Sequence, residues 1–343
     1  MSSNPINVLF INEVSKRVRD YLADNLVDYR NINFIYPSDF SHQNLLEIVR
    51  DAKVLIGWRP TKEMLEKAEK LKFFINPGAG VKHLIDLFRD ITRNNDVVLI
   101  NGHGNSYFVA QHAVALLLTL MNKIIPHHFW MKQGRWRTGD SEAASIPLRF
   151  RKIGLLGYGA INQKVHQMLS GFDVKFHILK KSWQDSKINI TEFKRYDPSQ
   201  LREFCNEIDT LIIAVPHTSL TENMIGGEEL RLLGKGNKKG LVVNVARGEI
   251  IEEKALYDSL NDNRIAGAAI DVWYIYKPSE DDKGRKYPYN YPFHELDNII
   301  LSPHRGYSPF NDLLRWNEVI ENLKKISRGE KRFINVVNLK LEY

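Results

Sequence analysis

The stretch from residue 151 to residue 182 constrains the fold of this chain more than any other. A short apolar run, 153–156, has the length of a buried strand, and it breaks into the sequence GYGAIN. Apolar residues then recur at helical spacing, and a second apolar run, 174–179, follows them. Strand, glycine turn, helix and strand in this order make one half of a dinucleotide-binding unit.

The glycines of this turn have a physical purpose. Gly157 permits a tight turn, and Gly159 lets the backbone approach a ligand closely. The N-terminus of the following helix offers unpaired N–H groups and a partial positive charge, which suit a diphosphate. The third position of the pattern, usually Gly or Ala, is Asn162, which weakens the expected close packing but not the phosphate site. The predicted cofactor-binding residues here are Gly157, Tyr158, Gly159, Ala160 and Ile161.

The end of the second strand indicates which dinucleotide binds. Proteins that bind NAD usually place Asp or Glu here, against the ribose 2′-hydroxyl. This strand ends instead in Lys180, Lys181 and Ser182, which attract the 2′-phosphate that a carboxylate would repel. We therefore predict NADP as the preferred cofactor, with NAD as the alternative if the lysines only form a solvated loop.

Composition limits the class of protein. The 343 residues, 43% of them hydrophobic, suffice for two domains with sizeable cores. The single cysteine, Cys205, excludes an internal disulfide framework and favours a reducing, cytoplasmic compartment. No apolar run has the length of a signal peptide or a membrane span. The basic residues behind the net charge of +7 are interleaved with acids, so we expect no nucleic acid or membrane partner. The histidines lack the spacing of metal ligands, so we expect no metal partner.

Apolar runs of strand length alternate with helical segments along the chain. They occur at 7–11, 33–36, 54–57, 73–76 and 97–101, and after the dinucleotide unit at 210–215, 241–244, 266–270 and 299–302. This alternation predicts doubly wound parallel sheets with helices on both faces. A long apolar helix, 106–125, ended by Pro126, follows the first group of strands. The aromatic and basic segment 127–148 behind it is a candidate arm for packing on another subunit.

Polar residues follow the carboxyl ends of these strands, where ligands bind in open parallel sheets. Hydride transfer needs a proton donor or acceptor, a cation for the substrate, and backbone donors for a carboxylate. His304 suits the first role and Arg247 the second, because imidazole titrates near neutral pH and guanidinium binds carboxylate in bidentate fashion. The turn from Gly78 to Val81 suits the third. Each has a structural alternative: His304 would be a surface histidine, Arg247 would form an internal salt bridge, and the turn from Gly78 to Val81 would be a plain loop.

The chain resembles the D-isomer-specific 2-hydroxyacid dehydrogenase family, which includes phosphoglycerate, glyoxylate/hydroxypyruvate and formate dehydrogenases. The resemblance covers nearly the whole chain and rests on motifs in their family order. They are GAGVKHL from Gly78, NSYFVAQHA from Asn105, GLLGYGAI from Gly154, VPHTSLT from Val215, NVARGEII from Asn244, GAAIDVW from Gly267 and SPH from Ser302.

This resemblance implies a fold of two similar α/β domains with doubly wound parallel sheets. A Rossmann NAD(P)-binding domain, residues 106–306, would be inserted into a flavodoxin-like substrate domain formed by residues 1–105 and 307–343. The resemblance also implies an active site in a cleft and, usually, a homodimer.

The resemblance further assigns roles to single residues. It implies Arg247 as the substrate-binding arginine, His304 as the acid/base and Asp271 as the aspartate near the nicotinamide, whereas we interpret His112 as structural. The implied substrate-binding residues are Gly78, Ala79, Gly80, Val81 and Asn105. The further cofactor-binding residues are Val215, Pro216, Thr221, Val245, Ala246 and Gly306.

One position departs from the family pattern. The family usually has Glu five residues after the aspartate, where this chain has Tyr276. We predict Tyr276 as a catalytic residue that hydrogen-bonds His304; alternatively, the insertion 279–291 folds back and supplies Glu280. Without a carboxylate partner, neutral His304 should dominate at a lower pH than is usual in the family.

The sequence therefore predicts an oxidoreductase that moves a hydride between NADP(H) and a small 2-oxo or 2-hydroxy acid of D configuration. The alternative is a dinucleotide-sensing binding protein with little turnover, because the family includes corepressors and the usual partner of the histidine is missing.

Overall fold

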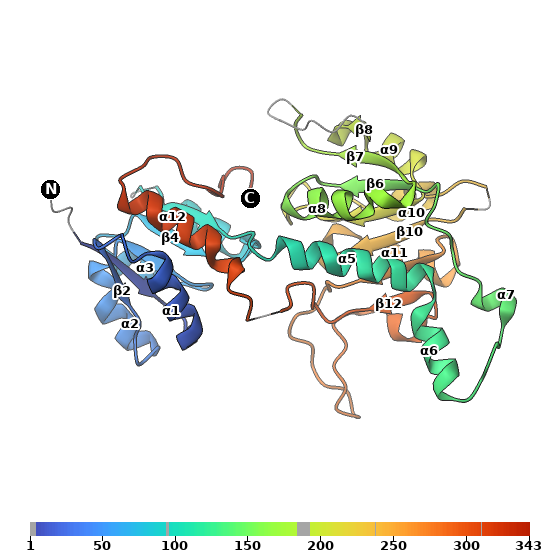
Figure 1. Cartoon of the computed structure of the whole chain (residues 1–343), viewed down its shortest axis with the longest axis horizontal. Helices are drawn as coiled ribbons and strands as arrows, with labels where there is room; N and C mark the ends of the chain where they lie inside the picture. Colours follow the sequence, from blue (N-terminus) through green and yellow to red (C-terminus); the bar gives the residue numbers. More distant parts are fainter. Residues whose placement is uncertain (1–4, 94–95, 184–192, 237, 310) are drawn as a thin grey trace. The chain divides into compact units, whose positions relative to one another are not determined.

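A computed structural model of the chain describes residues 5–93, 96–183, 193–236, 238–309 and 311–343. The chain forms two compact units, which are Met1–Asn105 with Pro309–Tyr343, and Ser106–Ser308. The expectation from sequence placed the second boundary after residue 306. Each unit has a parallel sheet between two layers of helices, so the predicted fold class is confirmed (Figure 1).

The first unit is built on a five-stranded parallel sheet with the order β2-β1-β3-β4-β5. Its strands are β1 (Ile6–Phe10), β2 (Ile32–Ile35), β3 (Val54–Ile56), β4 (Phe73–Asn76) and β5 (Val98–Asn101). Its helices are α1 (Lys16–Asn25), α2 (His42–Ile48), α3 (Lys62–Lys67), α4 (Lys82–Ile91) and, from the C-terminal end of the chain, α12 (Asn317–Ser327).

Both faces of this sheet are buried, which explains why its strands are apolar at most positions. Val8 packs in one cluster with Leu22 of α1 and Leu323 of α12. Its neighbour Leu9 points to the opposite face and packs in a second cluster with Phe88 of α4. The C-terminal helix thus returns to the first sheet.

The second unit has a seven-stranded parallel sheet with the order β12-β11-β10-β9-β6-β7-β8. Its strands are β6 (Lys152–Leu156), β7 (Lys175–Leu179), β8 (Phe193–Tyr196), β9 (Thr210–Ile213), β10 (Leu241–Asn244), β11 (Gly267–Ile270) and β12 (Ile299–Leu301). Its helices are α5 (Ser106–Met121), α6 (Ile124–Lys132), α7 (Asp140–Ala143), α8 (Ala160–Leu169), α9 (Leu201–Glu207), α10 (Gly227–Leu232) and α11 (Glu253–Asn261).

The order of these strands reverses at β6, because the chain runs outward to β7 and β8 and then returns to β9 on the other side. Such a switch point leaves a crevice outside the carboxyl ends of the strands, where ligands bind in open sheets. The glycine turn follows β6 directly. The topology therefore puts this turn at the position expected for a dinucleotide site.

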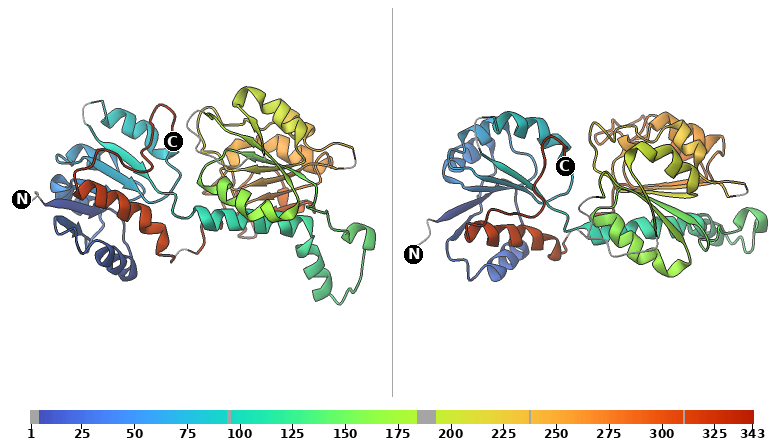
Figure 2. Two further views of the ribbon diagram at one scale, coloured as in Figure 1. Left: turned by 45° about the horizontal axis from the view of Figure 1, so that its top comes forward. Right: turned by 90° about the horizontal axis from the view of Figure 1, so that it is seen from above.

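The long helix ends earlier than the sequence suggested. Helix α5 stops at Met121, because Lys123 adopts a left-handed conformation with φ of 51° and breaks the helix. Pro126 lies in the first turn of α6, where its missing N–H group costs nothing. Helices α6 and α7 extend away from the body of the second unit (Figure 2). Among the described helices, only α5 and α6 taken together, with a 61° bend, have the length and composition of a membrane span.

Candidate functional site

The glycine turn of the second unit requires glycine at one position and leaves open space at another. Gly157 has a φ of 80°, and a Cβ atom there would lie 2.7 Å from Cγ1 of Val215 and 2.8 Å from the carbonyl oxygen of Ala214. A Cβ at Gly159 would meet no atom within 4 Å. Helix α8 starts at the next residue, so its first N–H groups face this open space. The turn can therefore receive a diphosphate.

Two side chains within the motif hold this turn in place. Asn162 is fully buried, and its Nδ2 donates to the carbonyls of Leu156 at 3.1 Å, Gly157 at 2.7 Å and Ile212 at 3.4 Å. This residue therefore ties the turn to β6 and β9, a role that the sequence reasoning missed.

The second support is Tyr158, which is buried and whose hydroxyl lies 2.7 Å from Nδ1 of His166 in α8. This contact joins the middle of the turn to the helix that follows it. The side chain of Tyr158 therefore points into the protein, and a ligand would meet its backbone.

The end of β7 carries more positive charge than the predicted lysines alone. Lys180 and Arg195 both lie beside the Trp183 ring, with the ammonium 5.8 Å and the guanidinium 5.1 Å from its centroid. Trp183 is itself fixed, because its Nε1 donates to the carbonyl of Tyr196 at 2.9 Å. Arg195 comes from β8, whose four residues were not recognised as a strand. The register of β7 with β8, which pairs Ile178 with Arg195, brings this third basic residue to the site.

The loops after β9 and β10 hold the other predicted cofactor contacts. The hydroxyl of Thr221 donates to the carbonyl of Pro216 at 2.7 Å and accepts from the N–H of Thr218 at 2.9 Å, which closes the loop after Val215. After β10, Val245 and Ala246 are buried. Both loops leave the sheet at its carboxyl edge.

Asn244, the last residue of β10, shapes the loop that bears Arg247. Its Oδ1 accepts from the N–H of Ala246 at 3.0 Å, and its Nδ2 donates to the carbonyl of Arg247 at 2.8 Å. The guanidinium of Arg247 donates to the carbonyl of Ala246 at 2.6 Å. Within the described residues no carboxylate lies within 4 Å of it. The side chain is thus a half-buried cation that remains able to bind an acid.

Asp271, which follows β11, accepts hydrogen bonds from four donors. Its Oδ1 accepts from the Ser302 hydroxyl at 2.5 Å, the N–H of Arg305 at 2.7 Å and Nε2 of His112 at 3.2 Å. Its Oδ2 accepts from the N–H of Gly306 at 2.8 Å. Burial raises the pKa of this carboxyl, but the hydrogen bonds outweigh that effect and leave the pKa below its ordinary value. Asp271 is therefore ionised at neutral pH.

His304 lies in the loop after β12, in a left-handed conformation with φ of 55°. Burial lowers the pKa of His304, the positive charge of Arg247 lowers it further, and the negative charge of Asp271 opposes both. The net pKa lies below its ordinary value. The imidazole is thus mostly neutral at neutral pH, in the direction expected from the sequence.

The ring of Tyr276 lies beside His304, with centroids 5.5 Å apart and an angle of 60° between the planes. This is an edge-on ring contact in the position where the family has glutamate. The alternative partner, Glu280, pairs instead with Lys286 at 2.8 Å across the hairpin of the insertion. In the part of the chain that the structure describes, no carboxylate pairs with the His304 ring.

The turn Gly78–Val81 belongs to the first unit and leads from β4 into α4. Nδ2 of Asn76 donates to the first and third carbonyls of the turn, at 2.5 and 3.5 Å, and Nδ2 of Asn101 donates to the second, at 2.8 Å. With these carbonyls held inside, the N–H groups of the turn remain for an anion. Asn105 lies in the turn before α5 and is half-buried.

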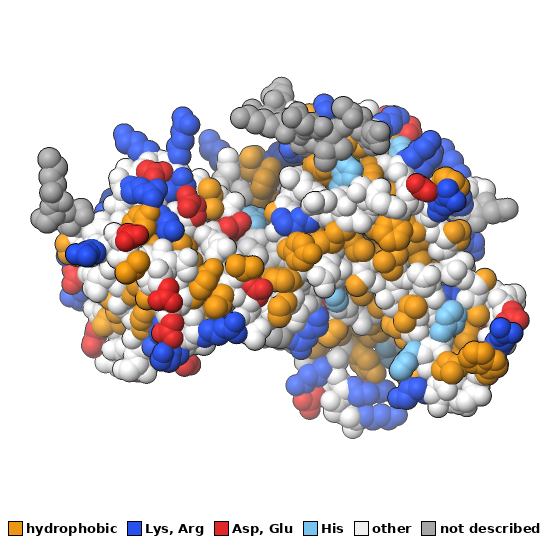
Figure 3. Space-filling view, in the orientation of Figure 1, with side chains coloured by type: hydrophobic (Ala, Val, Ile, Leu, Met, Phe, Trp, Pro, Cys, Tyr) orange, Lys and Arg blue, Asp and Glu red, His pale blue; other side chains and the backbone are white. Residues whose placement is uncertain are grey.

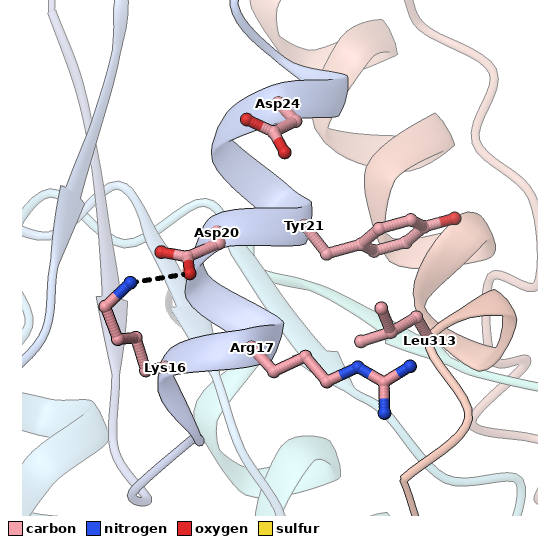
Figure 4. A pocket seen from close by; sticks show the side chains of 6 residues that line it. All are labelled: Lys16, Arg17, Asp20, Tyr21, Asp24 and Leu313. Atoms are coloured by element: carbon pink, nitrogen blue, oxygen red, sulfur yellow. Dashed lines mark hydrogen bonds and ion pairs between the residues drawn. The ribbon is translucent and has the colours of Figure 1, made fainter.

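A surface pocket of the first unit lies apart from all predicted site residues. It is formed by α1 and Leu313, as Figure 4 shows, and it contains the ion pair between Lys16 and Asp20, at 2.8 Å. The hydroxyl of Tyr21, which lines it, donates to Oδ1 of Asn317 at 2.7 Å and so joins α1 to α12. We interpret this pocket as a seam between two helices.

The second unit thus brings together Arg247, Asp271, Tyr276 and His304, and it holds the glycine turn and the basic end of β7. This part of the chain matches a family model. Residues 114–306, more than half of the chain, match D-isomer specific 2-hydroxyacid dehydrogenase, NAD binding domain. The chain belongs to this family.

Individual relatives agree with this assignment. The chain is 30% identical over 307 residues to D-3-phosphoglycerate dehydrogenase of Methanocaldococcus jannaschii, a match that covers 87% of this chain and 54% of the relative. It therefore spans about half the length of that protein. It is 29% identical over 304 residues to glyoxylate reductase of Pyrococcus furiosus, covering 85% and 84% of the two chains.

Among solved structures, the chain resembles an NADPH-dependent glyoxylate/hydroxypyruvate reductase from Sinorhizobium meliloti in complex with NADP and malonate. The TM-score is 0.70, the identity is 24%, and the match covers 99% of this chain and 98% of the other. At this identity the likeness shows a shared fold.

Proposed function

We propose that the chain is an oxidoreductase that transfers a hydride between NADP(H) and a 2-oxo acid or D-2-hydroxy acid. The observation that carries this proposal is the pair of Arg247 and His304, which follow β10 and β12 on either side of β11. Arg247 has no carboxylate partner among the described residues, and its charge acts on the pKa of His304. A guanidinium that is free for an acid, beside a titratable imidazole, is what reduction of a 2-oxo acid requires.

The residues of the second unit fit the cofactor. The open space over Gly159, with the start of α8 behind it, suits the diphosphate, and the buried Asn162 keeps the turn in shape. When bound, the cofactor supplies or accepts the hydride at its nicotinamide. Gly157, Ala160 and the loops after β9 and β10 would hold it through backbone groups.

Residues of this chain transfer the proton and bind the carboxylate of the substrate. In reduction, protonated His304 donates its proton to the carbonyl oxygen at C2, and the product is the 2-hydroxy acid. Arg247 binds the carboxylate and polarises the carbonyl. We keep Asn105 and the N–H groups of the turn Gly78–Val81, in the first unit, as proposed substrate-binding groups. In oxidation, neutral His304 accepts the proton from the hydroxyl.

The preference for NADP rests on the basic end of β7. Lys180, Lys181 and Ser182 follow this strand, and Arg195 adds a further cation beside the Trp183 ring. The relative from S. meliloti is described as NADPH-dependent. We expect Arg195→Ala to weaken NADPH binding about tenfold and to leave NADH binding unchanged, as fluorescence titration would measure.

A homodimer that forms through α6 and α7 is part of the proposal. Five exposed apolar side chains gather on α6 and the segment that leads to α7; they are Ile124 at 53%, Ile125 at 39%, Phe129 at 56%, Met131 at 53% and Trp136 at 71% exposure. Hydrophobic, histidine and basic side chains lie together on this segment (Figure 3). A second copy of the chain would cover them, and light scattering of Trp136→Asp beside the wild type tests this.

We also propose a cytoplasmic location, since the only thiol, Cys205, is buried and unbridged.

One experiment tests the reaction. NADPH and NADH are titrated separately, then glyoxylate, hydroxypyruvate, pyruvate and bulkier 2-oxo acids are added while oxidation of the reduced cofactor is followed. We expect tighter binding of NADPH, turnover of at least one acid, and a loss of at least about 100-fold in kcat for His304→Ala with NADPH binding retained. Tight binding without turnover of any acid would refute the reductase and favour the dinucleotide-sensing protein.

A further inference from the structure

His112, which the sequence indicates only as a structural residue, contacts two groups at the site. Its Nε2 lies 3.2 Å from Oδ1 of Asp271 and 3.0 Å from Oγ of Ser302. The single hydroxyl proton of Ser302 points to the carboxylate, because these two oxygens are only 2.5 Å apart. An unprotonated Nε2 would set its lone pair against an anionic oxygen, so Nε2 carries a proton and donates to both groups.

The Asp271 carboxylate connects this histidine to the loop that bears His304. The N–H groups of Arg305 and Gly306, the two residues after His304, donate to the carboxylate at 2.7 and 2.8 Å. On the other side of His304, the carbonyl of Ser302 accepts from Nε1 of Trp273 at 2.8 Å. The backbone is therefore fixed on both sides of His304.

The space around the carboxylate is filled. A Cβ atom at Gly306 would lie 2.9 Å from Oδ2 of Asp271 and 3.5 Å from Cδ2 of His112, so no side chain fits there. Three donors already occupy Oδ1 of Asp271, and one occupies Oδ2. Oδ1 is therefore committed to His112, Ser302 and the loop.

From these contacts we infer that His112 is a positioning residue for the proton-transfer step. It holds the Asp271 carboxylate and, through it, the backbone that aims His304. The inference rests on the proposed role of His304 in the reaction. This positioning matters in this chain because no carboxylate of the described residues pairs with the His304 ring. The loop backbone must therefore orient the imidazole, a role that the usual glutamate has in the family.

Three variants test the inference. His112→Leu removes the donor, His112→Gln offers an amide N–H in its place, and Gln111→Leu changes the exposed neighbour on the same helix as a control. We measure kcat and KM for reduction with NADPH, the pH dependence of kcat/KM, the melting temperature, and the titration of the His304 ring by NMR. The NMR titration needs no turnover.

We expect His112→Leu to lower kcat by about 10- to 100-fold, with KM for NADPH changed less than about threefold, because a small misplacement of the acid costs that much. The pKa of His304 should rise towards its ordinary value, because a loosened loop admits water to the ring. His112→Gln should recover most of kcat and the wild-type titration, and Gln111→Leu should match the wild type.

Two results would overturn the inference. One is a kcat within twofold of the wild type in His112→Leu. The other is a fall in melting temperature and kcat in His112→Leu that His112→Gln does not recover, while the pKa of His304 stays unchanged. That combination would indicate a purely structural histidine. If the wild type reduces no acid, the proposed function fails, but the NMR titration of the three variants still decides whether His112 positions His304.

Discussion

Two glycine turns, one in each unit, present backbone N–H groups in a similar way. The turn Gly78–Val81 joins β4 to α4, and the turn Gly157–Gly159 joins β6 to α8. In each, a buried asparagine binds carbonyl oxygens with its amide: Asn76 in the first unit and Asn162 in the second. Carbonyls that are held inside leave the N–H groups for an anionic ligand.

The turns differ in why they contain glycine. Gly157 has a left-handed φ, and a Cβ there would collide with the chain after β9. A Cβ at Gly78 would lie 3.5 Å from Nε1 of Trp58, which is an ordinary contact. The second unit therefore needs glycine for its backbone, whereas the first needs it only to keep the space over the turn open. Substitutions test this difference when they separate an effect on the stability of the protein from an effect on the space that a ligand has over the turn.

The largest effect should come from Gly157→Ala. A non-glycine residue in this conformation costs about 1–3 kcal/mol, and the collision with Val215 and Ala214 adds to it. We expect a lower melting temperature and a Kd for NADPH raised at least about 100-fold, as fluorescence titration and thermal unfolding would measure. Gly171→Ala is the matched control, because a Cβ there meets nothing within 4 Å. A Kd within tenfold of the wild type would contradict the backbone requirement.

The turn after β6 could be predicted because its signals are local. The apolar run, the two glycines and the helical spacing lie within twenty residues, and each has its own physical cause. The same holds for the alternation that predicted parallel sheets.

The ends of helices were harder to predict. Helix α5 stops because Lys123 adopts a left-handed conformation, and a lysine in the sequence does not indicate one. Pro126 usually indicates the end of a helix, but here it lies in the first turn of α6, which accepts proline.

The supports of the site could not be predicted, because they join residues that are far apart in the chain. His112 and Asp271 are 159 positions apart, and Asn162 reaches a carbonyl of β9 50 positions away. Neither distance leaves a periodic pattern. Arg195 was missed because β8 has only four residues, of which two are basic and exposed. The sequence can predict which residues do chemistry more readily than which residues hold them.

The two asparagines should give the next largest effect, and they should affect different ligands. Asn162→Ala and Asn76→Ala each remove hydrogen bonds that hold turn carbonyls, which costs about 0.5–1.5 kcal/mol of stability for each bond. We expect Asn162→Ala to raise the Kd for NADPH about tenfold and to leave KM for the 2-oxo acid unchanged, whereas Asn76→Ala should do the reverse. If both variants change the same parameter, the two turns do not serve separate ligands.

A smaller effect concerns the loop after β12, where burial and Arg247 lower the pKa of His304. Reduction needs protonated His304, so kcat/KM for reduction should fall as pH rises through a pKa below the ordinary value of about 6.5. Tyr276→Glu restores a carboxylate beside the imidazole, which raises that pKa and moves the fall to higher pH. We expect about fivefold faster reduction at pH 8, and no such movement for the uncharged control Tyr276→Gln.

The smallest effect should come from Gly78→Ala. The new Cβ touches Trp58 without collision and Gly78 has no left-handed φ, so the melting temperature should match the wild type. The methyl group reduces the space over the turn, so KM for the 2-oxo acid should rise about threefold while the Kd for NADPH stays constant. Trp58→Ala in the same chain removes the ring that the methyl group meets and should return KM towards its original value. A fall in melting temperature comparable to that of Gly157→Ala would mean that both turns need glycine for the backbone, and that access explains neither.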